Sequence, residues 1–91
     1  METSTSLFWE RYKKAPIVGI IRGQPLDVVL KIARAYEDAG LTTLEITMNT
    51  AGAATMISTL RSKFPNLNIG AGTVCSLLEL REAIDAGAQF I

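Results

Sequence analysis

Residues 41–48 read LTTLEITM, and this stretch decides the fold. Thr43, Glu45 and Thr47 share one face of the predicted strand, because side chains alternate along an extended backbone. Leu44, Ile46 and Met48 share the other face. An inner strand that helices cover on both sides is apolar on both faces, whereas this strand has one polar face with a carboxylate. In a barrel the apolar face would pack against helices and Glu45 would point inward; on an exposed edge or in a salt bridge Glu45 would be structural.

The apolar pattern on either side of this strand alternates between helical and extended periods. It predicts a helix over residues 4–14, strands over 17–21, 43–47 and 68–72, a helix after each strand, and a fourth strand beginning at residues 90–91. Gly40 and Gly87 are predicted helix stops within a repeated Asp-Ala-Gly segment. This order predicts a parallel sheet with right-handed crossovers.

The predicted fold is α/β. Residues 1–91 are interpreted as a single incomplete domain, with an N-terminal helix over 1–15 and the first half of a (β/α)8 TIM barrel over 16–91. The barrel portion comprises (βα)3 and the start of strand four. A three-stranded parallel sheet has two open edges and a thin core, and such sheets usually close into a barrel or are covered on both faces. A complete small α/β domain is the alternative.

Composition excludes several functional classes. The 91 residues carry nine basic and nine acidic side chains, which argues against a nucleic-acid partner. One cysteine and no histidine exclude a disulfide framework and leave a transition metal without its usual ligands. No apolar run is long enough to span a membrane. The N-terminus lacks the pattern of a secretory signal.

Polar residues near the ends of the predicted strands are the candidates for chemistry. Glu45 in a partly desolvated barrel interior would have a raised pKa, which suits general acid–base work. Arg22 ends the first strand, where an arginine can bind a carboxylate or phosphate, or can simply be solvated. Thr73 follows the small residues Gly-Ala-Gly, which leave room for a ligand or for close packing. Cys75 is expected to be a small, partly buried structural residue.

Four segments together resemble the 2-keto-3-deoxy-6-phosphogluconate (KDPG) and 4-hydroxy-2-oxoglutarate (KHG) aldolase family. They read PIVGIIR at 16–22, AGLTTLEITMNT at 39–50, GAGTV at 70–74 and AGAQFI at 86–91. The resemblance implies a TIM barrel, a cytoplasmic homotrimer and a class I aldolase that forms a Schiff base between a lysine and pyruvate, without a metal or cofactor. The substrate would be a small 2-keto acid.

The resemblance also implies roles for individual residues. Glu45 matches the catalytic glutamate that shuttles protons, and Arg22 matches an arginine near the polar end of the substrate. Thr73 matches the threonine of the pyruvate pocket, and Thr47 is expected to line that pocket beside Glu45. Asn49 stands where many members have arginine, so the manner in which this chain would hold an anionic group is open.

The Schiff-base lysine of the family belongs to strand six, beyond residue 91. The resemblance therefore implies that this chain lacks the nucleophile and is inactive alone. Two other interpretations stay open: a non-catalytic α/β module for assembly or ligand binding, and another phosphosugar-type barrel enzyme with the same N-terminal layout.

Overall fold

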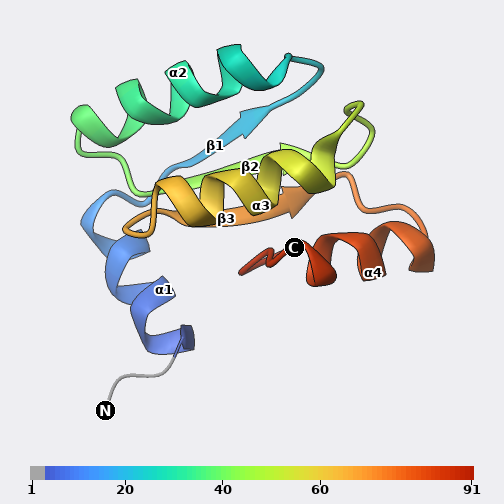
Figure 1. Cartoon of the computed structure of the whole chain (residues 1–91). Helices are drawn as coiled ribbons and strands as arrows, with labels where there is room; N and C mark the ends of the chain where they lie inside the picture. Colours follow the sequence, from blue (N-terminus) through green and yellow to red (C-terminus); the bar gives the residue numbers. More distant parts are fainter. Residues whose placement is uncertain (1–3) are drawn as a thin grey trace.

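The computed structural model describes residues 4–91, in which helices and strands alternate along the chain (Figure 1). Met1 to Thr3, part of the segment on which the prediction about a secretory signal rests, lie outside the described residues. The elements are α1 Ser4–Lys14, β1 Val18–Ile21, α2 Leu26–Asp38, β2 Thr43–Thr47, α3 Ala53–Lys63, β3 Asn68–Gly72 and α4 Leu77–Asp85. No helix in this range combines the length and apolar character needed to cross a membrane.

The three strands form one parallel sheet in the order β1-β2-β3. Ile20 pairs with Glu45, and Glu45 pairs with Gly70, so these three residues share one face. Ile46 and Ala71 belong to the other face. The structure thus confirms the α/β class and the parallel sheet, and it matches the alternation of residues 43–47.

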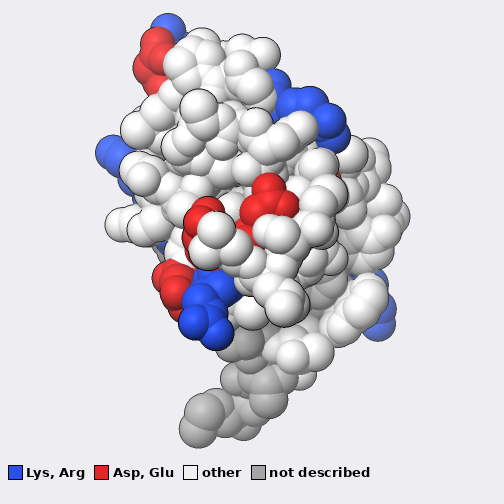
Figure 2. Space-filling model, turned by 90° about the vertical axis from the view of Figure 1, so that its right-hand side faces the viewer, with Lys and Arg blue, Asp and Glu red and all other residues white. Residues whose placement is uncertain are grey.

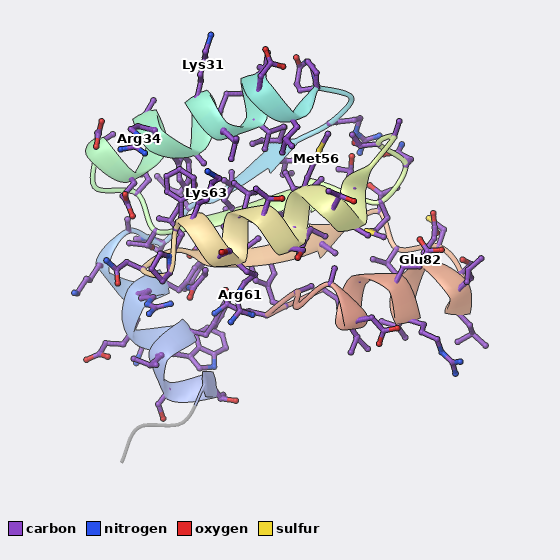
Figure 3. All side chains as sticks on the ribbon, viewed as in Figure 1. Lys31, Arg34, Met56, Arg61, Lys63 and Glu82 are labelled. Carbon is purple, nitrogen blue, oxygen red and sulfur yellow. The ribbon has the colours of Figure 1, made fainter. Side chains whose placement is uncertain are left out.

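The apolar face of the sheet packs against α2 and α3. Leu44, Ile46 and Ile69 are fully buried there, together with Val29 of α2 and Leu60 of α3. Figure 3 shows the same division on the helices: Met56 projects from α3 toward α2, whereas Lys31 projects away from the body of the molecule. Burying each large aliphatic side chain contributes about 1.5–3 kcal/mol, so this layer supplies most of the stabilisation.

The opposite face of the sheet is partly bare at β1. Ile20 is 63% exposed and Val18 is 39% exposed, although both are large and apolar. The register places them on the face that carries Glu45. Parallel sheets normally have both faces covered, so this face is suited to contact with further protein.

Helix α1 lies at the N-terminal ends of the strands (Figure 1). The amide of Asn68 donates to the carbonyl oxygen of Phe8 at 2.9 Å, and the hydroxyl of Thr42 donates to the carbonyl oxygen of Arg11 at 2.7 Å. The rings of Phe8 and Phe90 also meet, with centroids 5.3 Å apart. These contacts close the end of the sheet that lies away from the carboxyl ends of the strands.

The predicted fourth strand is wrong as a regular strand, because residues 88–91 have no strand assignment. They do run beside β3. The backbone N–H of Gln89 donates to the carbonyl oxygen of Ile69 at 2.8 Å, and the N–H of Ala71 donates to the carbonyl oxygen of Phe90 at 3.0 Å. Oε1 of the Gln89 side chain accepts the backbone N–H of Ile69 at 2.7 Å. This short, irregular pairing cannot form the repeated ladder that defines a strand.

Helices α2 and α4 end in the same way, as the repeated segment predicted. Gly40 and Gly87 have φ of +84° and +97°, which a residue with a side chain rarely adopts. After α2, the N–H of Gly40 donates to Glu37 at 3.0 Å and the N–H of Leu41 donates to Tyr36 at 3.1 Å. The N–H groups of residues 87 and 88 make the corresponding two bonds after α4. Both ends are Schellman motifs, which satisfy carbonyl groups that the helix leaves free.

The start of α4 depends on the predicted capping residue. Ser76 Oγ accepts the N–H of Glu79 at 3.1 Å. Glu79 Oε1 accepts the N–H of Cys75 at 2.8 Å, one residue earlier than in a standard capping box. Cys75 is a free, exposed thiol, which corrects the expectation of a partly buried residue. The reason is that the segment between β3 and α4 runs over the surface, as connecting loops usually do.

Candidate functional site

Glu45 lies in the middle of β2, on the face of the sheet opposite α2 and α3. Its side chain is half-buried. Burial raises the pKa of this carboxyl above its ordinary value of 4.5, and the positive charge of Arg22 opposes that rise. A carboxyl with a raised pKa gives up and takes back a proton more readily near neutral pH than an ordinary glutamate does.

Arg22 and Thr73 meet at the carboxyl ends of β1 and β3. Arg22 Nη2 donates to Thr73 Oγ1 at 3.1 Å, so the contact reaches across the end of β2. Both residues are exposed. The end of the sheet that Figure 2 turns toward the viewer is mostly uncharged, with a few acidic and basic side chains among neutral ones. The arginine and the hydroxyl therefore form a polar group open to solvent beside Glu45.

Thr73 has an unusual backbone for a residue with a branched side chain. Its φ is 51°, and it is the single non-glycine residue within 4–91 that has a positive φ. This conformation costs about 1–2 kcal/mol in an L-residue. Such strain is often found in binding sites, where the surrounding structure holds a residue in a particular orientation. No feature of the sequence around Thr73 predicts it.

Thr47 is fully buried, and its hydroxyl is occupied by a neighbour. Thr47 Oγ1 lies 2.9 Å from Thr50 Oγ1, and Thr50 Oγ1 also accepts the N–H of Gly23 at 2.9 Å. These contacts join the loop after β2 to the loop after β1, directly beside Arg22. Thr50 is not among the residues predicted from the sequence; its position three residues after Thr47 in a turn was the available clue.

Gly70 and Gly72 complete the face beside Glu45. A side chain at Gly70 would meet the ring of Phe90, and one at Gly72 would meet the carboxylate of Glu45. The small residues of β3 thus make room for two side chains of the same chain. Of the two uses predicted for this space, a ligand or close packing, the structure shows close packing by the side chains of Glu45 and Phe90.

The remaining candidates are exposed residues of a loop and of helices. Asn49 is exposed in the loop between β2 and α3. The four lysines are also exposed, and none of them lies on a strand of the described chain; they are Lys13, Lys14, Lys31 and Lys63. Residues 4–91 therefore provide a carboxyl, a guanidinium and a hydroxyl at one end of the sheet, but no amine beside them.

The sheet is parallel, and a partly desolvated carboxyl, an arginine and a threonine lie near the carboxyl ends of its strands, which is where βα enzymes place their sites. Comparison with known families agrees with this class. The sequence model of the family described as KDPG and KHG aldolase matches residues 9–91. The chain belongs to this aldolase family, which confirms the resemblance found in the sequence.

Individual relatives support the same assignment. The chain is 35% identical over 75 residues to the KHG/KDPG aldolase of Escherichia coli K12, covering 82% of this chain and 35% of that protein. It is 36% identical over 91 residues to the 2-dehydro-3-deoxy-phosphogluconate aldolase of Pseudomonas aeruginosa, covering all of this chain and 41% of that protein. The chain thus spans less than half the length of these relatives.

Solved structures are similar as well. One is the KDPG aldolase of Legionella pneumophila with pyruvate captured as a covalent carbinolamine intermediate. It matches with a TM-score of 0.77 and 29% identity, over 96% of this chain and 40% of that one. The 2-keto-3-deoxy-6-phosphogluconate aldolase of Zymomonas mobilis matches with a TM-score of 0.78 and 28% identity, over 91% of this chain and 40% of that one.

Proposed function

We propose that this chain supplies the acid–base portion of a class I aldolase that acts on a small 2-keto acid. The observation that carries this proposal is the half-buried Glu45, which lies beside Arg22 and has a raised pKa. The chain that holds it belongs to a family of aldolases. Glu45 moves protons during formation and breakdown of the lysine–pyruvate adduct. The candidate substrates are 2-keto-3-deoxy-6-phosphogluconate, cleaved to pyruvate and glyceraldehyde 3-phosphate, and 4-hydroxy-2-oxoglutarate, cleaved to pyruvate and glyoxylate.

Arg22 and Thr73 would bind the anionic end of the substrate. A guanidinium can hold a carboxylate through two parallel hydrogen bonds, and the same guanidinium already donates to the hydroxyl oxygen of Thr73. Thr47 acts behind the site, because its hydroxyl is engaged with Thr50. The loop residue Asn49 brings no charge to the site, so the anionic group of the substrate is assigned to Arg22, which lies beside Glu45.

We further propose that the sheet is the first part of a (β/α)8 barrel. Helices cover one face of the sheet, as they cover the outside of a barrel. The opposite face carries Glu45 and the exposed Ile20, and it would become the inside of the barrel when further strands complete it. The Schiff-base lysine would come from a later strand, as the family resemblance implies. A cytoplasmic homotrimer of the whole enzyme follows from the same resemblance, and the chemistry calls for no metal ion.

The test is an assay of aldol cleavage with the purified 91-residue chain, alone and co-expressed with a second polypeptide. That polypeptide is taken from the Pseudomonas aeruginosa aldolase, and it consists of the part of that aldolase that the alignment with this chain does not cover. We expect no cleavage above background by the chain alone, because no lysine is near Glu45, and measurable cleavage by the pair.

The matched variant is Glu45→Gln, which keeps the size of the side chain and removes its acid–base function. We expect it to lower cleavage by the pair by about 10²–10⁴-fold, the usual contribution of a general acid–base group. Turnover by a verified 91-residue product alone, or full activity of the pair carrying Glu45→Gln, would contradict the proposed function.

A further inference from the structure

The backbone conformation at Gly72 does not require a glycine. The glycines with positive φ are Gly23, Gly40, Gly52 and Gly87, and Gly72 is not among them. It is buried at the carboxyl end of β3, and glycine weakens a strand relative to residues with side chains. The reason for a glycine at this position must therefore be the space beside it.

That space is filled by the carboxylate of Glu45. A Cβ atom built on Gly72 would lie 2.3 Å from Oε1 and 2.7 Å from the carboxyl carbon of Glu45. Both distances are much shorter than the van der Waals separation of two carbon atoms, which is about 3.5 Å. The head of the Glu45 side chain therefore lies directly against the backbone of Gly72.

We propose that Gly72 is a positioning residue for Glu45: the missing side chain leaves a slot on β3 that holds the carboxylate against the sheet. This inference rests on the proposed function for its catalytic meaning. The slot itself is rigid, because the carbonyl oxygen of Gly72 accepts the N–H of Met48 at 2.8 Å. The strand that carries Glu45 and the strand that receives it are thus joined at the point of contact.

The neighbouring positions explain why the carboxylate extends toward Gly72. Glu45 pairs with Ile20 on one side and with Gly70 on the other. The space over Gly70 belongs to the ring of Phe90, which a Cβ there would approach to 2.5 Å. Ile20 is bulky and apolar. The slot at Gly72 is the place on this face where the carboxylate finds backbone without a side chain, and it lies toward Arg22 and Thr73.

The test is the substitution Gly72→Ala in the 91-residue chain, read by carbon-13 NMR titration of the Glu45 carboxyl. The added methyl group would displace the carboxylate into water. Because burial is the main cause of the raised pKa, we expect the pKa of Glu45 to move down toward 4.5. This readout needs no turnover, so it stands apart from the test of the proposed function.

A double-mutant cycle with Glu45→Ala separates this contact from a general effect on the strand. When Glu45 is present, Gly72→Ala is expected to lower the folding equilibrium constant by less than about tenfold, because the atoms that the methyl group meets are the far end of a flexible side chain, which can move aside. When Glu45→Ala has removed the carboxylate, the same substitution is expected to be neutral or stabilising, because alanine suits a strand better than glycine. If Gly72→Ala alone fails to fold, recovery of folding by Glu45→Ala gives the same support.

Two results would overturn the proposal. One is an unchanged Glu45 pKa in folded Gly72→Ala; the other is an equal loss of stability from Gly72→Ala with and without the Glu45 side chain. In the complemented enzyme of the cleavage assay, the same substitution should lower kcat more than it raises KM. If complementation yields no cleavage while the NMR shift and the cycle are as expected, the proposed function fails and the positioning contact stands.

Discussion

The charge of Glu45 is the residue-scale feature with the clearest dependence on pH. Its carboxyl has a raised pKa in the folded chain, so this carboxyl binds a proton more tightly in the folded chain than in the unfolded chain. Stability from this group is therefore greatest at acidic pH, and it falls as the pH rises from the unfolded value of 4.5 through the folded value. At neutral pH the ionised carboxylate is a modest cost to the fold.

Glu45→Gln is accordingly expected to raise the free energy of unfolding at pH 7, by less than about 1 kcal/mol because the side chain remains partly open to water. The gain in free energy of unfolding should disappear as the pH falls below 4.5, where the protonated Glu45 is neutral like the glutamine that replaces it. Urea denaturation from pH 3.5 to 8 measures it. A control is Glu82→Gln on exposed α4. A gain that is constant across this range would show that the effect does not come from the ionisation of Glu45.

The sequence predicted the residues at the carboxyl ends of the strands more fully than the contacts between them. Alternation along β2 is enough to place Glu45 on the face opposite the helices, and strand order is enough to bring Arg22 near Thr73. The hydroxyl pair of Thr47 and Thr50 depends on how a loop turns, and the contact of Glu45 with Gly72 depends on side-chain direction across two strands. Periodicity carries neither kind of information.

At the scale of elements, the buried Asn68 is one of the residues that attach helix α1 to the sheet. Its amide nitrogen donates to Phe8 at 2.9 Å and to Thr43 Oγ1 at 3.1 Å, and the residue is completely buried. Its other polar atom, Oδ1, is a buried acceptor with no partner in the described chain. The apolar pattern predicted α1 and β3 separately, but a single buried amide between two elements has no periodic signature.

Asn68→Ala is expected to loosen α1 and to lower the free energy of unfolding by about 1–3 kcal/mol, because it removes the hydrogen bonds that a buried amide donates to Phe8 and Thr43. Trp9 is the single tryptophan and lies on α1, half exposed, so its fluorescence reports on this helix. We expect a red-shifted emission that precedes loss of helical circular dichroism on heating. Asn66→Ala, at an exposed turn, is the control and should leave both signals unchanged.

At the scale of the whole molecule, β1 is an edge strand with exposed apolar side chains. It pairs with β2 alone in the described chain, and Ile20 and Val18 are open to solvent. Unprotected edges of this kind pair with other chains, and a charged residue is the usual protection against this. The sequence predicted two open edges; the edge at β1 is open, whereas residues 89 and 90 form hydrogen bonds along β3.

The expected consequence is concentration-dependent association of the 91-residue chain, which Ile20→Lys should weaken by about tenfold or more in dissociation constant. One buried aliphatic side chain contributes about 1.5–3 kcal/mol, enough for this change. Sedimentation velocity over a range of concentrations measures it. Thr55→Lys, on the exposed surface of α3, is the control. Equal association of both variants would place the contact elsewhere, for example on the exposed Leu77 and Leu78 of α4.

The matching ends of α2 and α4 have a consequence for how this sequence can vary. Gly40 and Gly87 occupy equivalent places in two copies of one terminator, and nothing lies within 4 Å of a Cβ at Gly40. The constraint there comes from the local backbone rather than from the surroundings. A scan of substitutions would therefore show intolerance at both of these positions, which lie 47 residues apart, with asparagine as the least harmful replacement. Genetic drift would be free to alter the surface on either side of them while both terminators persist unchanged.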